Sequence, residues 1–203
     1  LIRRLNGNDG LSAVAVSGPR RIGKSSLLRR FGSQVMREQL YPATRDWAVA
    51  YVDASSGPWQ GFDLFRGRIL SCIAQQIDCQ LPPRCAEMSL QDAILEVLDG
   101  TRRPIVLIID EFDVISAELR KTEQAELRGA VSNIPLFGLV LSTATDPDRI
   151  LEFVGDDVSD LVGILSVAQP RLGALKPSEA RELIHVARLD NGLESDEQAA
   201  DLI

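Results

Sequence analysis

The sequence predicts an α/β protein in which helices cover both faces of a mainly parallel sheet. First, apolar runs of strand length alternate with segments whose apolar residues recur every three or four positions. Second, Ile105–Ile109 is an unbroken run of branched apolar residues, typical of a strand buried on both faces. Third, 45% of the 203 residues are hydrophobic and 25% are charged, a balance that provides one sizeable core.

The predicted strands are apolar runs closed by turn-forming or acidic residues. The first run ends at Ser17-Gly18, and the second ends at Asp53, just before a Ser-Ser-Gly-Pro turn. The third lies between Pro104 and Asp110. The strand predicted nearest the C-terminus, residues 171–175, has the weakest apolar pattern of the five. The predicted strands are residues 11–16, 47–52, 105–109, 139–141 and 171–175.

The predicted helices each carry an apolar face at helical spacing. The longest such series runs from Phe62 to Ile77. Ser89 followed by Asp92 indicates a helix start, Pro177 suits a first helical position, and Ser195 begins a capping box. The predicted helices are residues 25–31, 62–77, 89–98, 115–131 and 177–185, with one more from 195 onward.

Composition excludes several classes of protein. Three cysteines and one histidine make a disulfide-stapled secreted domain or a Cys/His zinc site poor fits. No apolar run approaches the roughly 20 residues of a membrane span, and no signal peptide follows Leu1. We therefore expect a piece of a longer cytoplasmic chain without membrane contact. Residues 1–175 would form the α/β core, and residues 176–203 the truncated start of a helical lid.

Residues 18–25, here called the glycine loop, match the pattern GxxxxGK followed by Ser or Thr between a strand and a helix. Glycines let successive backbone N–H groups point at a phosphate chain, and the helix N-terminus adds positive potential. Lys24 would reach the terminal phosphates, and the Ser25 hydroxyl would bind Mg²⁺. The expected nucleotide contacts are Gly18, Pro19, Arg20, Arg21, Ile22, Gly23, Lys24, Ser25 and Ser26.

An acidic pair follows the most apolar strand. Asp110 comes at its carboxyl end, where ligands of open α/β sheets bind, and we expect it to hold Mg²⁺. Glu111 is the expected catalytic base that orients and polarises the attacking water, with Lys24 also assigned to catalysis. The alternative is a solvated acidic turn. Asp113 more simply begins the next helix.

The strand at 139–141 ends in two hydroxyls. If this strand lies between the other two site-bearing strands, Ser142 or Thr143 would face the γ-phosphate and sense it. We assign Ser142 this catalytic role, and the alternative is an ordinary polar strand end. Ala144 occupies the lysine position of a guanine-reading motif, which favours ATP over GTP. Arg149 is a weak candidate for an arginine finger in cis.

Five segments together resemble the ATPase core of prokaryotic STAND proteins, which are signal-transducing P-loop NTPases related to AAA+ proteins and origin-recognition initiators. The resemblance covers about residues 11–184. The loop and acidic strand are shared by many ATPases, so the form of the loop and the late element carry most of it. The segments are GPRRIGKSSLLRRF, YVDASSG, LIIDEFD, LVLSTATD and RLGALKPSEARELI.

This resemblance implies a three-layer sandwich with a five-stranded sheet in the order 5-1-4-3-2. It also implies an ATP-driven switch that self-associates in its ATP form and signals to effector or sensor domains of the same chain, often in antiviral defence. Hydrolysis by the isolated piece would be slow. The family's adenine-contacting box before the first strand has no counterpart among the ten residues preceding Leu11.

Two functions of different class compete with this switch. One is an initiator- or transposition-type ATPase acting on DNA. The net charge of −7 disfavours nucleic-acid binding by this piece itself. The other is a scaffold that binds nucleotide without turnover, which would have no need of Glu111.

Overall fold

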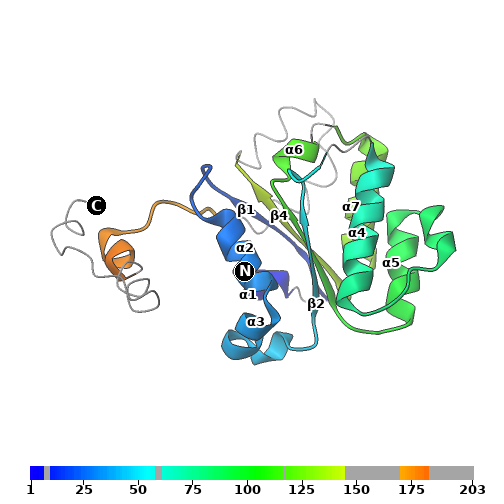
Figure 1. Ribbon diagram of the computed structural model, residues 1–203, viewed down its shortest axis with the longest axis horizontal. Coiled ribbons are helices and arrows are strands. Elements are labelled where there is room, and N and C mark those ends of the chain that lie inside the picture. The colour runs from blue at the N-terminus through cyan, green and yellow to red at the C-terminus, as the bar shows by residue number, and fades with distance from the viewer. Residues whose placement is uncertain (7–9, 58–60, 117, 145–169, 183–203) are drawn as a thin grey trace. The chain divides into compact units, whose positions relative to one another are not determined.

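The computed structural model describes residues 1–6, 10–57, 61–116, 118–144 and 170–182. By its internal contacts the chain divides into one unit of Leu1–Leu172 and a second of Gly173–Ile203. Within the described residues, the first unit contains a sheet of four parallel strands in the order β1-β4-β3-β2 (Figure 1). The strands are β1 (Ala13–Ser17), β2 (Ala48–Asp53), β3 (Ile105–Asp110) and β4 (Phe137–Thr143).

Helices cover both faces of this sheet, as the alternating pattern predicts. Figure 1 shows α2 and α3 on one side of the sheet and α4, α5 and α7 on the other. The α-helices are α1 (Ile2–Leu5), α2 (Lys24–Gly32), α3 (Gln34–Leu40), α4 (Phe62–Gln76), α5 (Leu90–Asp99), α6 (Asp113–Ser116) and α7 (Lys121–Asn133). Two 3₁₀ turns are η1 (Pro42–Thr44) and η2 (Pro83–Ala86). In the second unit, residues 177–182 are helical from the expected Pro177.

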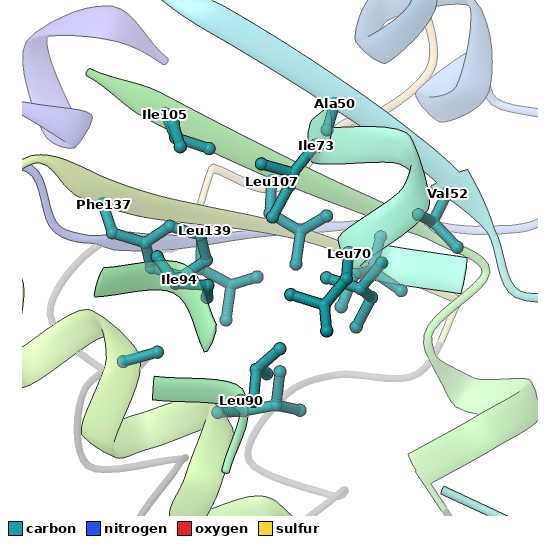
Figure 2. Packing of buried hydrophobic residues seen from close by; sticks show 14 of the residues in the cluster. Ala50, Val52, Leu70, Ile73, Leu90, Ile94, Ile105, Leu107, Phe137 and Leu139 are labelled. Carbon is teal, nitrogen blue, oxygen red and sulfur yellow. The ribbon is translucent and has the colours of Figure 1, made fainter. Parts of the chain in front are cut away.

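The strands divide their side chains between two apolar cores, because successive residues of a strand point to opposite faces. Ile105, Leu107 and Ile109 of β3 join the core beneath α4, α5 and α7. Val106 and Ile108 join the other core, with Leu28 of α2. Figure 2 labels side chains of β2, β3 and β4, together with α4 and α5, gathered in the first core. Burial on both faces explains the continuous apolar composition of β3.

The prediction of a fifth strand over residues 171–175 is wrong. Arg171 makes one parallel bridge to Ser17, and the Leu172 amide donates to the Ser17 carbonyl at 2.8 Å. Pairing ends there. Residues 171–175 are largely exposed and include Gly173, so they bury little apolar surface that would support a longer strand.

The expected single helix over 115–131 is also wrong, because the structure has two helices there, α6 and α7. The second start is built at Arg120, whose backbone N–H donates to the Glu123 carboxylate at 2.8 Å. By contrast, Ser89 is confirmed as a helix cap, since its hydroxyl accepts from the Asp92 amide at 3.1 Å. No helix in the described ranges is long and apolar enough to cross a membrane.

The two-core arrangement predicts that a central β3 side chain contributes far more to the free energy of unfolding than an exposed helical side chain does. Leu107 is fully buried against α4 residues, so Leu107→Ala should lower the free energy of unfolding by about 2–5 kcal/mol. Leu95→Ala, at a position 43% exposed on α5, is the matched control and should change it by less than about 0.5 kcal/mol. Denaturant unfolding measures both. Equal losses would contradict this account of the core.

Candidate functional site

The glycine loop joins the end of β1 to the start of α2, as predicted. Gly23 has a φ of 101° and Arg21 a φ of 64°, so the backbone turns through left-handed conformations within the loop. Gly18 has a φ of 155°, and a Cβ at this position would lie 2.6 Å from the Leu172 carbonyl oxygen. A side chain at Gly18 would therefore clash, which explains this glycine physically.

The loop leaves backbone donors unused at the amino end of α2. The cap residue of α2 is Gly23, which offers no side-chain cap. Within the described part of the chain, the backbone N–H groups of residues 20–26 have no acceptor. Lys24, which is 7% exposed, turns back and donates from Nζ to the carbonyls of Gly18 at 2.8 Å and Pro19 at 3.0 Å. This concentration of N–H groups and one ammonium suits an anion.

Asp110 lies opposite this loop, at the carboxyl end of β3, and is 1% exposed. Its carboxylate accepts hydrogen bonds from the Ser142 hydroxyl, the Tyr51 hydroxyl and the Glu111 amide, the last at 3.1 Å. The Ser25 side chain lies close enough to help lower the pKa of this carboxyl. The two expected Mg²⁺ ligands, Ser25 and Asp110, are therefore adjacent, although they come from different elements.

These hydrogen bonds keep the Asp110 carboxyl ionised. Burial by itself would raise its pKa, but the hydrogen bonds from Ser142, Tyr51 and the Glu111 amide, with the nearby Ser25 hydroxyl, together outweigh that effect, so the pKa lies below its ordinary value of 3.8. An ionised carboxylate beside a hydroxyl is a donor set that Mg²⁺ accepts, with phosphate oxygens and water completing its coordination. The residues present therefore fit Mg²⁺. No group of three or more His, Cys, Asp or Glu side chains forms a separate metal site in the described ranges.

Glu111 occupies an unusual backbone position. Its φ is 55°, in a region that non-glycine residues seldom adopt and that is enriched at functional sites. Its amide is fixed by the Ser142 hydroxyl at 3.0 Å as well as by Asp110. Its half-buried carboxylate has no hydrogen-bond or ion-pair partner in the described part of the chain. The carboxylate is therefore available to a ligand or a water.

Strand β4 lies between β1 and β3, the arrangement on which the predicted sensing role of Ser142 or Thr143 depends. Ser142 is fully buried, and its hydroxyl donates to Asp110 and accepts from Glu111. The Thr143 hydroxyl donates to the Asp113 carboxylate at 2.6 Å. The geometry thus gives Ser142 a positioning role, while its contact with a γ-phosphate stays a prediction.

Sequence reasoning missed Tyr51 on β2. Its hydroxyl donates to Asp110, and Arg29 of α2 lies over its ring at 5.8 Å. Burial raises the pKa of Tyr51, and the Asp110 hydrogen bond raises it further, so the hydroxyl stays protonated and can donate. A signal was present, because a tyrosine within a buried strand needs a partner for its hydroxyl. Arg149 and Asp146 lie outside the described residues.

A family model described as an AAA domain matches residues 8–151. This chain belongs to the AAA domain family. No curated protein matches its sequence. The AAA assignment agrees with the parallel sheet, the glycine loop after β1 and the acidic pair after β3.

Solved structures share the fold of this AAA domain at low sequence identity. The ORC2 protein of Aeropyrum pernix, in ADPNP–ADP complexes, has a TM-score of 0.70 and 19% identity over 93% of this chain and 48% of its own. A Walker-type ATPase of Pyrococcus abyssi has a TM-score of 0.67 and 17% identity over 93% and 56%. Domain III of the Thermotoga maritima replication initiation protein DnaA has a TM-score of 0.59 and 15% identity over 99% and 71%.

This AAA domain spans about half the length of the first two proteins. The resemblance to the STAND branch is not confirmed by these comparisons, which instead include several replication initiators.

Ser142→Ala tests the positioning role without nucleotide. The change removes a donor to a buried carboxylate and one acceptor of the Glu111 amide, so the free energy of unfolding should fall by about 1–3 kcal/mol. Denaturant unfolding of the nucleotide-free protein measures this loss. Ser71→Ala, at an exposed helical serine, is the control and should be nearly neutral. An equal effect at both positions would argue against the role.

The lowered pKa of Asp110 predicts how its contribution varies with pH. Because the folded pKa lies below the unfolded one, its stabilisation is present above about pH 4 and is lost as pH falls through the folded pKa. The difference in unfolding free energy between wild type and Asp110→Asn should therefore shrink between pH 7 and pH 3 without Mg²⁺. Asp99→Asn, at an exposed position ending α5, is the control. A pH-independent difference would be inconsistent with this.

Proposed function

We propose that this AAA domain binds ATP with Mg²⁺ and hydrolyses the γ-phosphate bond. One observation carries the proposal. The Ser25 hydroxyl at the end of the glycine loop lies close to the ionised Asp110 at the end of β3, beside a run of unused backbone N–H groups. That combination suits a polyphosphate with its divalent cation far better than it suits a neutral ligand.

Each residue has a distinct part in this proposal. The loop amides of residues 20–26 bind phosphate oxygens, and the Lys24 ammonium moves from the Gly18 and Pro19 carbonyls to the terminal phosphates. Ser25 and Asp110 would hold Mg²⁺, which would supply neutralisation of charge on the phosphate oxygens. The Glu111 carboxylate orients the attacking water and accepts its proton.

For the whole protein's function, an initiator-type ATPase that acts on DNA is better supported than a STAND-type switch. The support is likeness of fold to proteins solved with such ligands: an ORC1 protein of Aeropyrum pernix in complex with DNA, and a DnaA bound to AMPPCP and single-stranded DNA. The charge of −7 leads us to expect that this domain drives a switch and contributes little DNA contact itself. The STAND-type switch, with ATP-dependent self-association and effector domains, remains the second candidate because of the late RLGALKPSEARELI element.

Two substitutions separate binding from hydrolysis. Lys24→Ala should lower ATP affinity at least tenfold in calorimetry with Mg²⁺, because it removes a charged contact to phosphate. Lys121→Ala, an exposed lysine that begins α7, is the control and should bind ATP like wild type. Glu111→Gln should retain binding and lower the hydrolysis rate on the order of a hundredfold or more. Wild-type hydrolysis by Glu111→Gln would exclude Glu111 as the base.

The wild-type protein and the Lys24→Ala variant also distinguish an initiator-type ATPase from a STAND-type switch. Salt-dependent DNA binding by the whole protein, lost when Lys24→Ala prevents ATP binding, would support the initiator-type function. ATP-dependent self-association without any DNA binding would support the STAND-type switch instead.

A further inference from the structure

The outer edge of β2 carries backbone groups that do not pair with β3. In the parallel pairing with β3, the Ala48 amide donates to Pro104 at 2.8 Å and the Ala54 amide donates to Asp110 at 2.9 Å. The residues between them alternate, so Val49 and Tyr51 direct their N–H and C=O groups away from β3. No described strand pairs with that side, because β2 ends the sheet order. Four backbone groups are thus left in an alternating donor and acceptor pattern.

A hollow of about 270 Å³ runs beside this edge and is here called the edge groove. Val49 and Tyr51 form its floor. Its lining also includes Arg29 and Gly32 from α2, and Arg68, Cys72, Gln75 and Gln76 from α4. Because α2 and α4 pack on opposite faces of the sheet, the groove has one wall from each face (Figure 1). The edge of β2 therefore lies between two helical walls rather than on a flat surface.

The charge of the edge groove is positive, in a chain whose net charge is −7. One arginine stands on each wall, and no carboxylate lines the groove. Arg68 is exposed and makes no ion pair within the described ranges, and Arg29 contacts Tyr51 rather than a carboxylate. Gln75 and Gln76 add neutral amide donors to the α4 wall.

We propose that the edge groove binds an extended peptide segment with acidic side chains, which adds a strand to β2. Consecutive side chains of such a strand point to opposite faces, so adjacent carboxylates would meet Arg29 on one wall and Arg68 on the other. The backbone pattern favours a peptide over a nucleic acid or a free anion. The phosphodiester of a nucleic acid has no hydrogen-bond donor, and a free phosphate cannot span the strand, whereas the Val49 and Tyr51 carbonyls need donors spaced as in a paired strand.

This surface also touches the nucleotide site, without depending on ATP hydrolysis for its own binding. Tyr51 contributes backbone groups to the floor of the edge groove, while its hydroxyl donates to Asp110. A strand paired with Tyr51 would hold that side chain more firmly against Asp110. A partner segment in the groove would therefore act on the site from the edge of the sheet.

The test uses the full 203-residue chain and a fluorescein-labelled, end-blocked peptide, Val-Thr-Glu-Glu-Thr-Val, followed by fluorescence anisotropy. We expect binding that weakens with salt, and about tenfold weaker binding to Arg68→Glu. Arg30→Glu is the matched control, because it makes the same charge change on α2 but at a residue outside the edge groove, and it should bind like wild type.

Two altered peptides separate strand pairing from simple charge attraction. A peptide N-methylated at alternate residues should lose binding, since it cannot donate to the Val49 and Tyr51 carbonyls, and a peptide with Lys in place of Glu should not bind. Protection of the Val49 and Tyr51 amides from hydrogen exchange should accompany binding. Equal binding of the N-methylated peptide, equal weakening by Arg30→Glu, or displacement by inorganic phosphate or an oligonucleotide at the same site would overturn the proposal.

Discussion

The site depends on one buried carboxylate, that of Asp110. Burying a charge is unfavourable unless it is fully hydrogen-bonded, and here the donors come from β2, β4 and the turn after β3, with the Ser25 hydroxyl of α2 close by. Each donor reaches Asp110 only when its own element is in register with β3. The need to hydrogen-bond this carboxylate therefore couples the order of the strands to the geometry of the glycine loop. A misplaced strand would leave the Asp110 charge buried without its hydrogen-bond donors.

The sequence predicts the fold where its signals are local. The β3 run is apolar throughout because both its faces are buried, and the glycine loop is identified by residues whose backbone angles require glycine or tolerate strain. The acidic pair was placed correctly at the end of β3, because parallel strands deliver their carboxyl ends to one edge.

The remaining features arise from contacts between distant segments. Tyr51 reaches Asp110 on the neighbouring strand β3, a pairing that no periodicity within β2 indicates. The break between α6 and α7 depends on a cap made by the Glu123 side chain, and the expected strand after Arg171 fails because its residues gain no burial. Such outcomes are decided by tertiary packing, which overrides local propensity.

The hydrogen bonds of Lys24 have a thermodynamic consequence for any anion that the loop receives. Its ammonium is already solvated by two carbonyls of its own loop, so capture of an anion is an exchange of partners rather than the formation of a new bond. The enthalpy of that exchange is the difference between the hydrogen bonds that Lys24 makes to the anion and those that it gives up. The Gly18 and Pro19 carbonyls must then hydrogen-bond to water or turn toward solvent. These two hydrogen bonds join Lys24 to its own loop and satisfy a cation that is nearly buried.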